Sequence, residues 1–170
     1  MSAIALTSKN KTDVLVKRSV SKDTSKMNTH KVIKTIVTSP KIYKPVGPYS
    51  QAILADKTLY ISGVLGLDAN AQLVSGGAAA QTRQVLDNMR HILEAGGASL
   101  ASVVKTTILL ANMDDFQAVN QVYAEYFPKN APARATYQVA KLPMGAAVEI
   151  EAIALSGDLV ITEAGPCPRT

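Results

Sequence analysis

The chain has 170 residues, of which 47% are hydrophobic and 18% are charged, and its mean hydropathy is +0.10. These values are typical of one globular domain with a buried core, and no stretch approaches the roughly 20 apolar residues that cross a membrane. One cysteine, Cys167, allows no internal disulfide, and with His30 and His91 it leaves too few nitrogen and sulfur ligands for the usual metal site. We therefore expect no metal, no cofactor, no membrane partner and a reducing compartment.

The net charge of +5 is unevenly distributed along the chain. Residues 1–44 contain ten Lys or Arg and two Asp, whereas residues 45–170 contain eight Lys or Arg and eleven Asp or Glu. The basic excess therefore lies in an N-terminal arm, and the mildly acidic remainder weakens the case for a nucleic-acid-binding body.

The N-terminal arm also sets the predicted domain boundaries. Residues 1–29 are rich in Lys, Ser and Thr and lack the unbroken apolar core of a signal peptide. We interpret residues 1–29 as a flexible basic extension, residues 30–157 as a single domain and residues 158–170 as a tail. The expected location is the cytoplasm, with the mitochondrion as the alternative.

The first half of the domain predicts three strands followed by a helix. Short β-branched or alternating runs are separated by clusters of proline and glycine. Val85, Met89 and Ile92 then keep helical spacing, and a Gly-Gly pair ends the run. The expected elements are strands over residues 32–37, 49–54 and 59–63, a turn over 68–72 and a helix over 78–95.

The second half predicts a strand, a helix and two more strands. Residues 103–111 are almost continuously apolar, and Asn112 is a candidate cap for a helix with Asp114 and Asp115 in its first turn. The expected buried stripe of this helix consists of Phe116, Val119, Tyr123 and Tyr126. The final strands are expected over residues 133–140 and 147–155.

This order of elements predicts an α+β fold. Two helices cover only one face of a six-stranded sheet, yet several of the strands are apolar on both sides. Packing against another copy of the chain would bury the second face, so we predict an obligate homo-oligomer.

Charged residues interrupt the last two strands. Alternation places Arg134 and Thr136 on one side of their strand, and Glu149 and Glu151 on the side of the last strand that faces away from the helices. One interpretation is a structural Arg–Glu ion pair or a solvated face. The other is a pocket in which the guanidinium binds a carboxylate and a glutamate positions water. The residues alone leave both open.

Several motifs carry a resemblance to a known family. They are GPYSQA at 47–52, LYISG at 59–63, QLVSGG at 72–77, VVKTTILLANMDDFQAVNQVYAEYF at 103–127 and PARATYQVAKLPMGAAVEIEAIAL at 132–155. Together they resemble the reactive intermediate deaminase (Rid) family, also called YjgF, and most closely its animal members described as perchloric-acid-soluble translation inhibitors.

The resemblance implies a chorismate-mutase-like six-stranded sheet with two helices on one face. It further implies a homotrimer with a site in each cleft between subunits. The implied activity is hydrolysis of 2-imino acids or their enamines to 2-oxo acids and ammonia, without a cofactor. The substrates would include 2-aminoacrylate, 2-iminobutanoate and 2-iminopropanoate, which are by-products of pyridoxal-phosphate enzymes that the activity would protect.

The resemblance also implies roles for particular residues. Arg134 would clamp the substrate carboxylate, and Glu149 would position the attacking water, whereas Glu151 is interpreted as structural. The other residues expected to line the cleft are Tyr49, Ser62, Gly63, Asn120 and Thr136. Thr136 stands where many bacterial members have cysteine. Gly63 is expected to let the backbone approach the ligand closely.

Two alternative functions remain open from the sequence. The basic arm could bind RNA electrostatically, as an endoribonuclease or translation inhibitor would require. The chain could instead form a trimer that binds small carboxylates without turnover.

Overall fold

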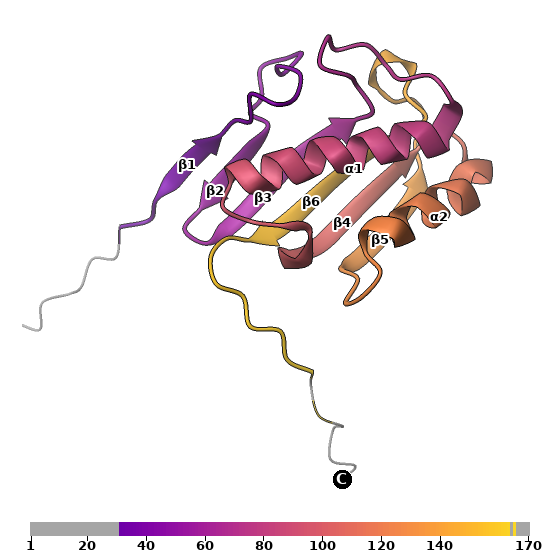
Figure 1. Cartoon of the computed structure of the whole chain (residues 1–170). Helices are drawn as coiled ribbons and strands as arrows, with labels where there is room; N and C mark the ends of the chain where they lie inside the picture. The colour runs from indigo at the N-terminus through magenta and orange to yellow at the C-terminus, as the bar shows by residue number, and fades with distance from the viewer. Residues whose placement is uncertain (1–30, 164, 166–170) are drawn as a thin grey trace, which may run out of the picture. The chain divides into compact units, whose positions relative to one another are not determined.

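A computed structural model describes residues 31–163 and residue 165 of the chain (Figure 1). The predicted basic extension, Cys167 and part of the predicted tail lie outside these described residues. No helix in the described part is long and apolar enough to cross a membrane.

The described residues form six strands and two α-helices, joined in three places by single 3-10 turns. The strands are β1 (Lys34–Val37), β2 (Ala52–Ala55), β3 (Thr58–Leu65), β4 (Val103–Leu110), β5 (Ala133–Gln138) and β6 (Val148–Leu155). The helices are α1 (Gly77–Ala95) and α2 (Phe116–Tyr126), and the 3-10 turns are Leu100–Ser102, Met113–Asp115 and Pro143–Gly145.

The strands form one mixed sheet in the order β1-β2-β3-β6-β4-β5. Only the β4–β5 pair is parallel, because α2 provides the crossover between these two strands. Helix α1 packs on β3, β6 and α2, and Figure 1 shows both helices on the same face of the sheet. The predicted α+β architecture is therefore confirmed, whereas its assembly as a trimer stays a prediction.

The core lies between the helices and the face of the sheet that they cover. The predicted stripe of α1 is fully buried, since Val85, Met89 and Ile92 are at most 1% exposed. Strand β6 alternates as expected: Val148, Ile150, Ala152 and Ala154 are buried beneath the helices, and the residues between them point the other way. The period of two in the sequence therefore assigned the faces of this strand correctly.

The face without helices is called the open face below. Residues that pair across neighbouring strands point to the same face of a sheet. The register of β3, β4, β5 and β6 therefore shows which of their residues belong to the open face. The open face includes Tyr60, Lys105, Thr107, Leu109, Tyr137, Glu149, Glu151, Ile153 and Leu155.

Most elements begin or end one to three residues from the expected positions, and three of these differences have a cause in the local geometry. Strand β2 starts at Ala52, because the preceding loop continues through Tyr49, whose N–H donates to the Gly47 carbonyl at 2.9 Å. Asn112 caps the 3-10 turn that precedes α2, its Oδ1 accepting from the Asp114 N–H at 3.0 Å. Strand β3 runs on to Leu65 through an irregularity in its pairing with β6 between Ile61 and Val64. This β-bulge matters for the site, since bulges redirect side chains.

Candidate active site

The first part of the candidate site is a hollow on the open face, beside the bulge of β3. It has a volume of about 310 Å³ and is called the Glu149 pocket. Its lining consists of Val46, Tyr49, Ser62, Gly63, Leu65, Pro143 and Glu149. The structure thus brings together four residues that the sequence singled out, from the proline-rich loop, β3 and β6.

Gly63 determines where the Glu149 side chain lies. A Cβ atom at position 63 would overlap Oε1 of Glu149 and would lie 2.8 Å from its Cδ. The absence of a side chain therefore lets Glu149 reach over the backbone of β3. The expectation from sequence assigned this space to the ligand, but in the structure the Glu149 carboxylate occupies it.

The Glu149 carboxyl group has a raised pKa. Its partial burial is the main cause, and the negative charge of Glu151, two residues along the same face, adds to it. No hydrogen bond or ion pair holds this carboxylate within residues 31–163 and 165, so both oxygens are available to water or a ligand. A carboxylate with a raised pKa is a stronger proton acceptor once it is ionised.

Ser62 and Tyr49 hold the wall of the Glu149 pocket. The Ser62 hydroxyl donates to the Ser50 carbonyl at 2.7 Å, which ties β3 to the segment before β2. The Tyr49 hydroxyl accepts from the Val46 N–H at 3.4 Å, closing the loop on itself. Both contacts stabilise the loop, and the oxygens keep lone pairs for a ligand.

Tyr43 is a neighbour that the sequence reasoning missed. It is 6% exposed, and its hydroxyl accepts from the Leu65 N–H at 3.1 Å, past the end of the β2–β3 pairing. Burial raises the pKa of this phenol, and the nearby Tyr49 and Glu149 raise it further. A lone aromatic in a proline-rich loop gave no periodic signal by which to find it.

The second part of the candidate site surrounds Arg134 on the edge strand β5. Arg134 pairs in register with the buried Thr106, which places it on the side of the sheet that carries the helices. Its guanidinium carbon lies 4.8 Å from the ring centroid of Tyr123 and 6.0 Å from that of Phe116. These cation–π contacts restrict the guanidinium without using its hydrogen-bond donors.

Asn120 and Thr136 share this region, which is called the Arg134 half-site. Asn120 lies one helical turn from both Phe116 and Tyr123, so it belongs to the stripe of α2 on which Arg134 stacks. Thr136 follows Arg134 by two residues and points to the same side of β5. Three more of the sequence-predicted residues are therefore grouped here.

The Thr136 hydroxyl has an unusual environment. Its Oγ1 is buried, and it is the one buried side-chain oxygen or nitrogen in the described residues without a hydrogen-bond partner. Leaving such a group unpaired costs about 1–3 kcal/mol. A buried polar atom of this kind beside a free guanidinium marks a place where a ligand could supply the missing partner.

The two groups of residues lie on opposite faces of one sheet. Arg134 is on the side of the helices and Glu149 is on the open face. Accordingly, no ion pair links Arg134 to Glu149 or Glu151 in the part of the chain that the structure describes. A ligand that touches both would have to take Arg134 from one copy of the chain and Glu149 from another.

This sheet, with both helices on one face, is that of the chorismate-mutase-like class of α+β proteins. The family model described as Endoribonuclease L-PSP matches residues 39–156. The chain is 51% identical over 129 residues to the Homo sapiens 2-iminobutanoate/2-iminopropanoate deaminase, covering 75% of this chain and 94% of that protein. The chain therefore belongs to the Endoribonuclease L-PSP family, which confirms the resemblance to the Rid (YjgF) proteins.

Solved structures agree with this assignment. The crystal structure of RidA from the Antarctic bacterium Psychrobacter sp. PAMC 21119 has a TM-score of 0.69 and 42% identity, covering 71% of this chain and 98% of that one. Escherichia coli TdcF with bound serine has a TM-score of 0.69 and 28% identity, covering 72% and 99% respectively.

Proposed function

We propose that this protein hydrolyses 2-imino acids, and their enamine tautomers, to 2-oxo acids and ammonia at sites between the subunits of a homotrimer. One observation carries the proposal. A cation suited to a carboxylate and a carboxylate suited to water activation lie on opposite faces of the sheet, in a chain 51% identical to a protein named for this activity. Neighbouring copies would bring the two together.

The Arg134 half-site would bind the substrate carboxylate. A guanidinium holds a carboxylate through two parallel hydrogen bonds, and the rings of Phe116 and Tyr123 limit its motion before the substrate arrives. Asn120 and the unpaired Thr136 hydroxyl would add hydrogen bonds at the same end of the ligand. Fixing the orientation in this way lowers the entropic part of the barrier.

The Glu149 pocket would carry out the addition of water. Glu149 accepts a proton as the water oxygen bonds to C2 of the protonated imine, which gives a carbinolamine. Glu149 then returns its proton to the nitrogen, the C2–N bond breaks and the nitrogen leaves as ammonia. The hydroxyl group gives its proton to water as C2 becomes the carbonyl carbon of the 2-oxo acid. A protonated imine is already a strong electrophile, so this route requires no covalent nucleophile and no cofactor. Val46, Leu65 and Pro143 form an apolar wall that suits a short aliphatic side chain.

The assay that tests this proposal generates the substrate in place. A pyridoxal-phosphate dehydratase would produce 2-aminoacrylate or its four-carbon homologue, and the appearance of 2-oxo acid would be followed with and without this protein. We expect the wild type to accelerate the reaction. Replacing Arg134 by alanine should lower kcat/KM by about 10²- to 10³-fold, since it removes one member of a desolvated charge pair.

Arg83 provides a matched control for that substitution. It is an exposed arginine of α1 that pairs with Glu125, so Arg83→Ala should keep activity within about twofold of wild type. Full activity in Arg134→Ala would show that the assignment is wrong. Binding of 2-oxo acids without any acceleration by the wild type would favour a carboxylate-binding trimer.

The description of the family supports one further candidate, an endoribonuclease. Its electrostatic basis would be the basic residues 1–29, which lie outside the described part, because residues 45–170 have an excess of acidic groups. Deleting residues 1–29 separates the two activities: an effect on RNA should disappear while deaminase activity survives. The cytoplasmic location, with the mitochondrion as the alternative, stays a prediction.

A further inference from the structure

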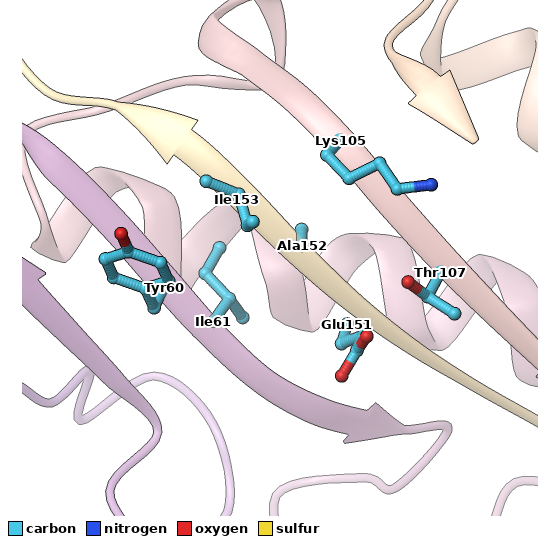
Figure 2. Close-up of a pocket in the computed structure, with 7 residues that line it drawn as sticks. All are labelled: Tyr60, Ile61, Lys105, Thr107, Glu151, Ala152 and Ile153. Atoms are coloured by element: carbon cyan, nitrogen blue, oxygen red, sulfur yellow. The ribbon is translucent and has the colours of Figure 1, made fainter. Parts of the chain in front are cut away.

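The open face carries one cation and one anion beside a shallow hollow. The hollow has a volume of about 290 Å³, and its lining consists of Tyr60, Ile61, Lys105, Thr107, Glu151, Ala152 and Ile153. Figure 2 shows Lys105 and Thr107 on one strand and Glu151 on the neighbouring strand, on the same face. This hollow is separate from the Glu149 pocket and contains none of the residues that the proposed reaction uses.

Neither charge has a partner within the described residues of the chain. The ion pairs found there are Lys41–Glu94, Arg83–Glu125 and Arg90–Asp87, and His91 contacts Glu94. Lys105 lies opposite Ile153, and Glu151 lies opposite Thr107, so the two charges are diagonal neighbours about 7–8 Å apart at the backbone. Both side chains are long enough to reach a partner beyond the face.

The open face also carries large apolar and aromatic side chains that are exposed to solvent. Tyr60 is 50% exposed, Tyr137 is 49% exposed and Leu155 is 37% exposed on the same face. A face of this kind is typical of a protein–protein interface. Covering it would bury Lys105 and Glu151, and a buried charge without a partner costs several kcal/mol. The two charges do not pair with each other in the structure, so a covering surface avoids this cost when it presents an anion to Lys105 and a cation to Glu151.

A second copy of this chain satisfies that requirement, because its own open face offers both charges. We propose that Lys105 of each subunit forms an ion pair with Glu151 of the neighbouring subunit, and that this pair fixes the register of the assembly. In a closed ring each subunit uses Lys105 on one side and Glu151 on the other, so every charge is paired. The inference concerns assembly, and it rests on the proposed function only in taking the ring as a trimer.

The pair would also connect assembly to the candidate catalytic carboxylate. Glu151 lies two residues from Glu149 on the same face of β6, and both positions are set by one strand. A contact that fixes the position of Glu151 against a neighbouring subunit therefore also fixes the position of Glu149 relative to that neighbour. Interfacial charge pairs are effective at setting register and excluding wrong alignments.

The test is charge reversal followed by mixing. Lys105→Glu and Glu151→Lys would each be examined by sedimentation velocity over a dilution series, with circular dichroism to check folding. Each single variant places like charges across every interface, so association should weaken by at least about 100-fold. The double variant, Lys105→Glu with Glu151→Lys, should regain association. Lys129→Glu, a reversal at an exposed lysine outside the open face, should associate as wild type does.

Mixing the two single variants shows whether the pair lies between subunits. A Lys105→Glu subunit beside a Glu151→Lys subunit has opposite charges at both possible junctions. A mixed trimer contains two such junctions, so the mixture should regain part of the lost association. Recovery in the double variant without recovery in the mixture would place the pair within one chain and overturn the proposal, as would single variants that associate normally.

Neutral variants keep the proposal testable if a reversed charge prevents folding. Lys105→Met and Glu151→Gln should each weaken association, and their combination should weaken it by less than the sum of the two effects. Full additivity would overturn the proposal. Deaminase activity of the wild type is measured separately, so a failure of the ion pair is distinguishable from a failure of the proposed reaction.

Discussion

Replacing Gly63 by alanine tests whether the position of the Glu149 carboxylate controls the reaction. The added Cβ would lie 2.8 Å from Cδ of Glu149, whereas ordinary contacts begin at 3.4 Å. The carboxyl carbon must therefore retreat by about 0.6 Å, and Oε1, which the methyl group would overlap, must move further. Gly63 is not one of the glycines with positive φ, so alanine brings no backbone strain of its own.

The expected consequence is a loss of rate with little loss of stability. A misplacement of about 1 Å in a catalytic group can cost about 10²-fold, so we expect kcat to fall by about 10- to 100-fold. Glu149 is half-buried and its side chain can move toward solvent, so the free energy of unfolding should change by no more than about 1 kcal/mol. The coupled assay and thermal unfolding measure the two effects.

A double-mutant cycle identifies the cause of the loss. Glu149→Asp shortens the side chain and withdraws the carboxylate from position 63. Adding Gly63→Ala to Glu149→Asp should therefore lower kcat little further than Glu149→Asp does alone. The reasoning is refuted if Gly63→Ala retains the wild-type kcat, or if the two losses are fully additive.

Three further substitutions have distinct expected results. Arg134→Lys keeps the charge but loses the planar fork, so KM should rise by about tenfold or more while the melting temperature hardly changes; steady-state kinetics with an unchanged KM would contradict this. Glu151→Gln removes a charge that raises the pKa of Glu149, so the Glu149 carboxylate should stay ionised at lower pH. The acid limb of the pH profile of kcat/KM should therefore shift to lower pH. That profile must be measured at concentrations where sedimentation shows full assembly, and an upward shift would be inconsistent with it. Thr136→Val removes an unpaired buried hydroxyl, so the free protein should become more stable by about 1 kcal/mol in denaturant titrations while KM rises; a loss of stability would show that Oγ1 has a partner.

Regular periodicity made much of the fold predictable from the sequence. The stripe of α1 and the alternation of β6 follow directly from the positions of apolar residues, because one face of each element is buried. The elements near the site were less predictable. The bulge of β3 interrupts the alternation at Ser62 and Gly63, and a pattern of residue types does not show where a strand gains an extra residue.

The relative placement of Arg134 and Glu149 could not be derived from the sequence. Alternation shows which residues of one strand share a side, but the side that β5 presents depends on its register with β4, and that register is set by the crossover through α2. The overlap between Glu149 and the space above Gly63 is likewise a contact between strands that are far apart in the chain. Both features depend on pairing over long sequence separations.

The candidate site is divided between the two faces of the sheet, so a second subunit packed on the open face would be needed to complete it. In a single chain, the Arg134 half-site could bind a carboxylate and the Glu149 pocket could hold water, but the sheet separates the two groups. In an assembly that covers the open face, apolar side chains such as Tyr60 and Leu155 would provide the free energy, yet they would specify alignment poorly because apolar contacts are not directional. An ion pair between Lys105 and Glu151 would specify alignment better, because any other alignment would leave both charges buried without a partner. Hydrophobic burial would therefore drive the assembly, and the charge pair would select the one alignment in which the two halves of the site face each other.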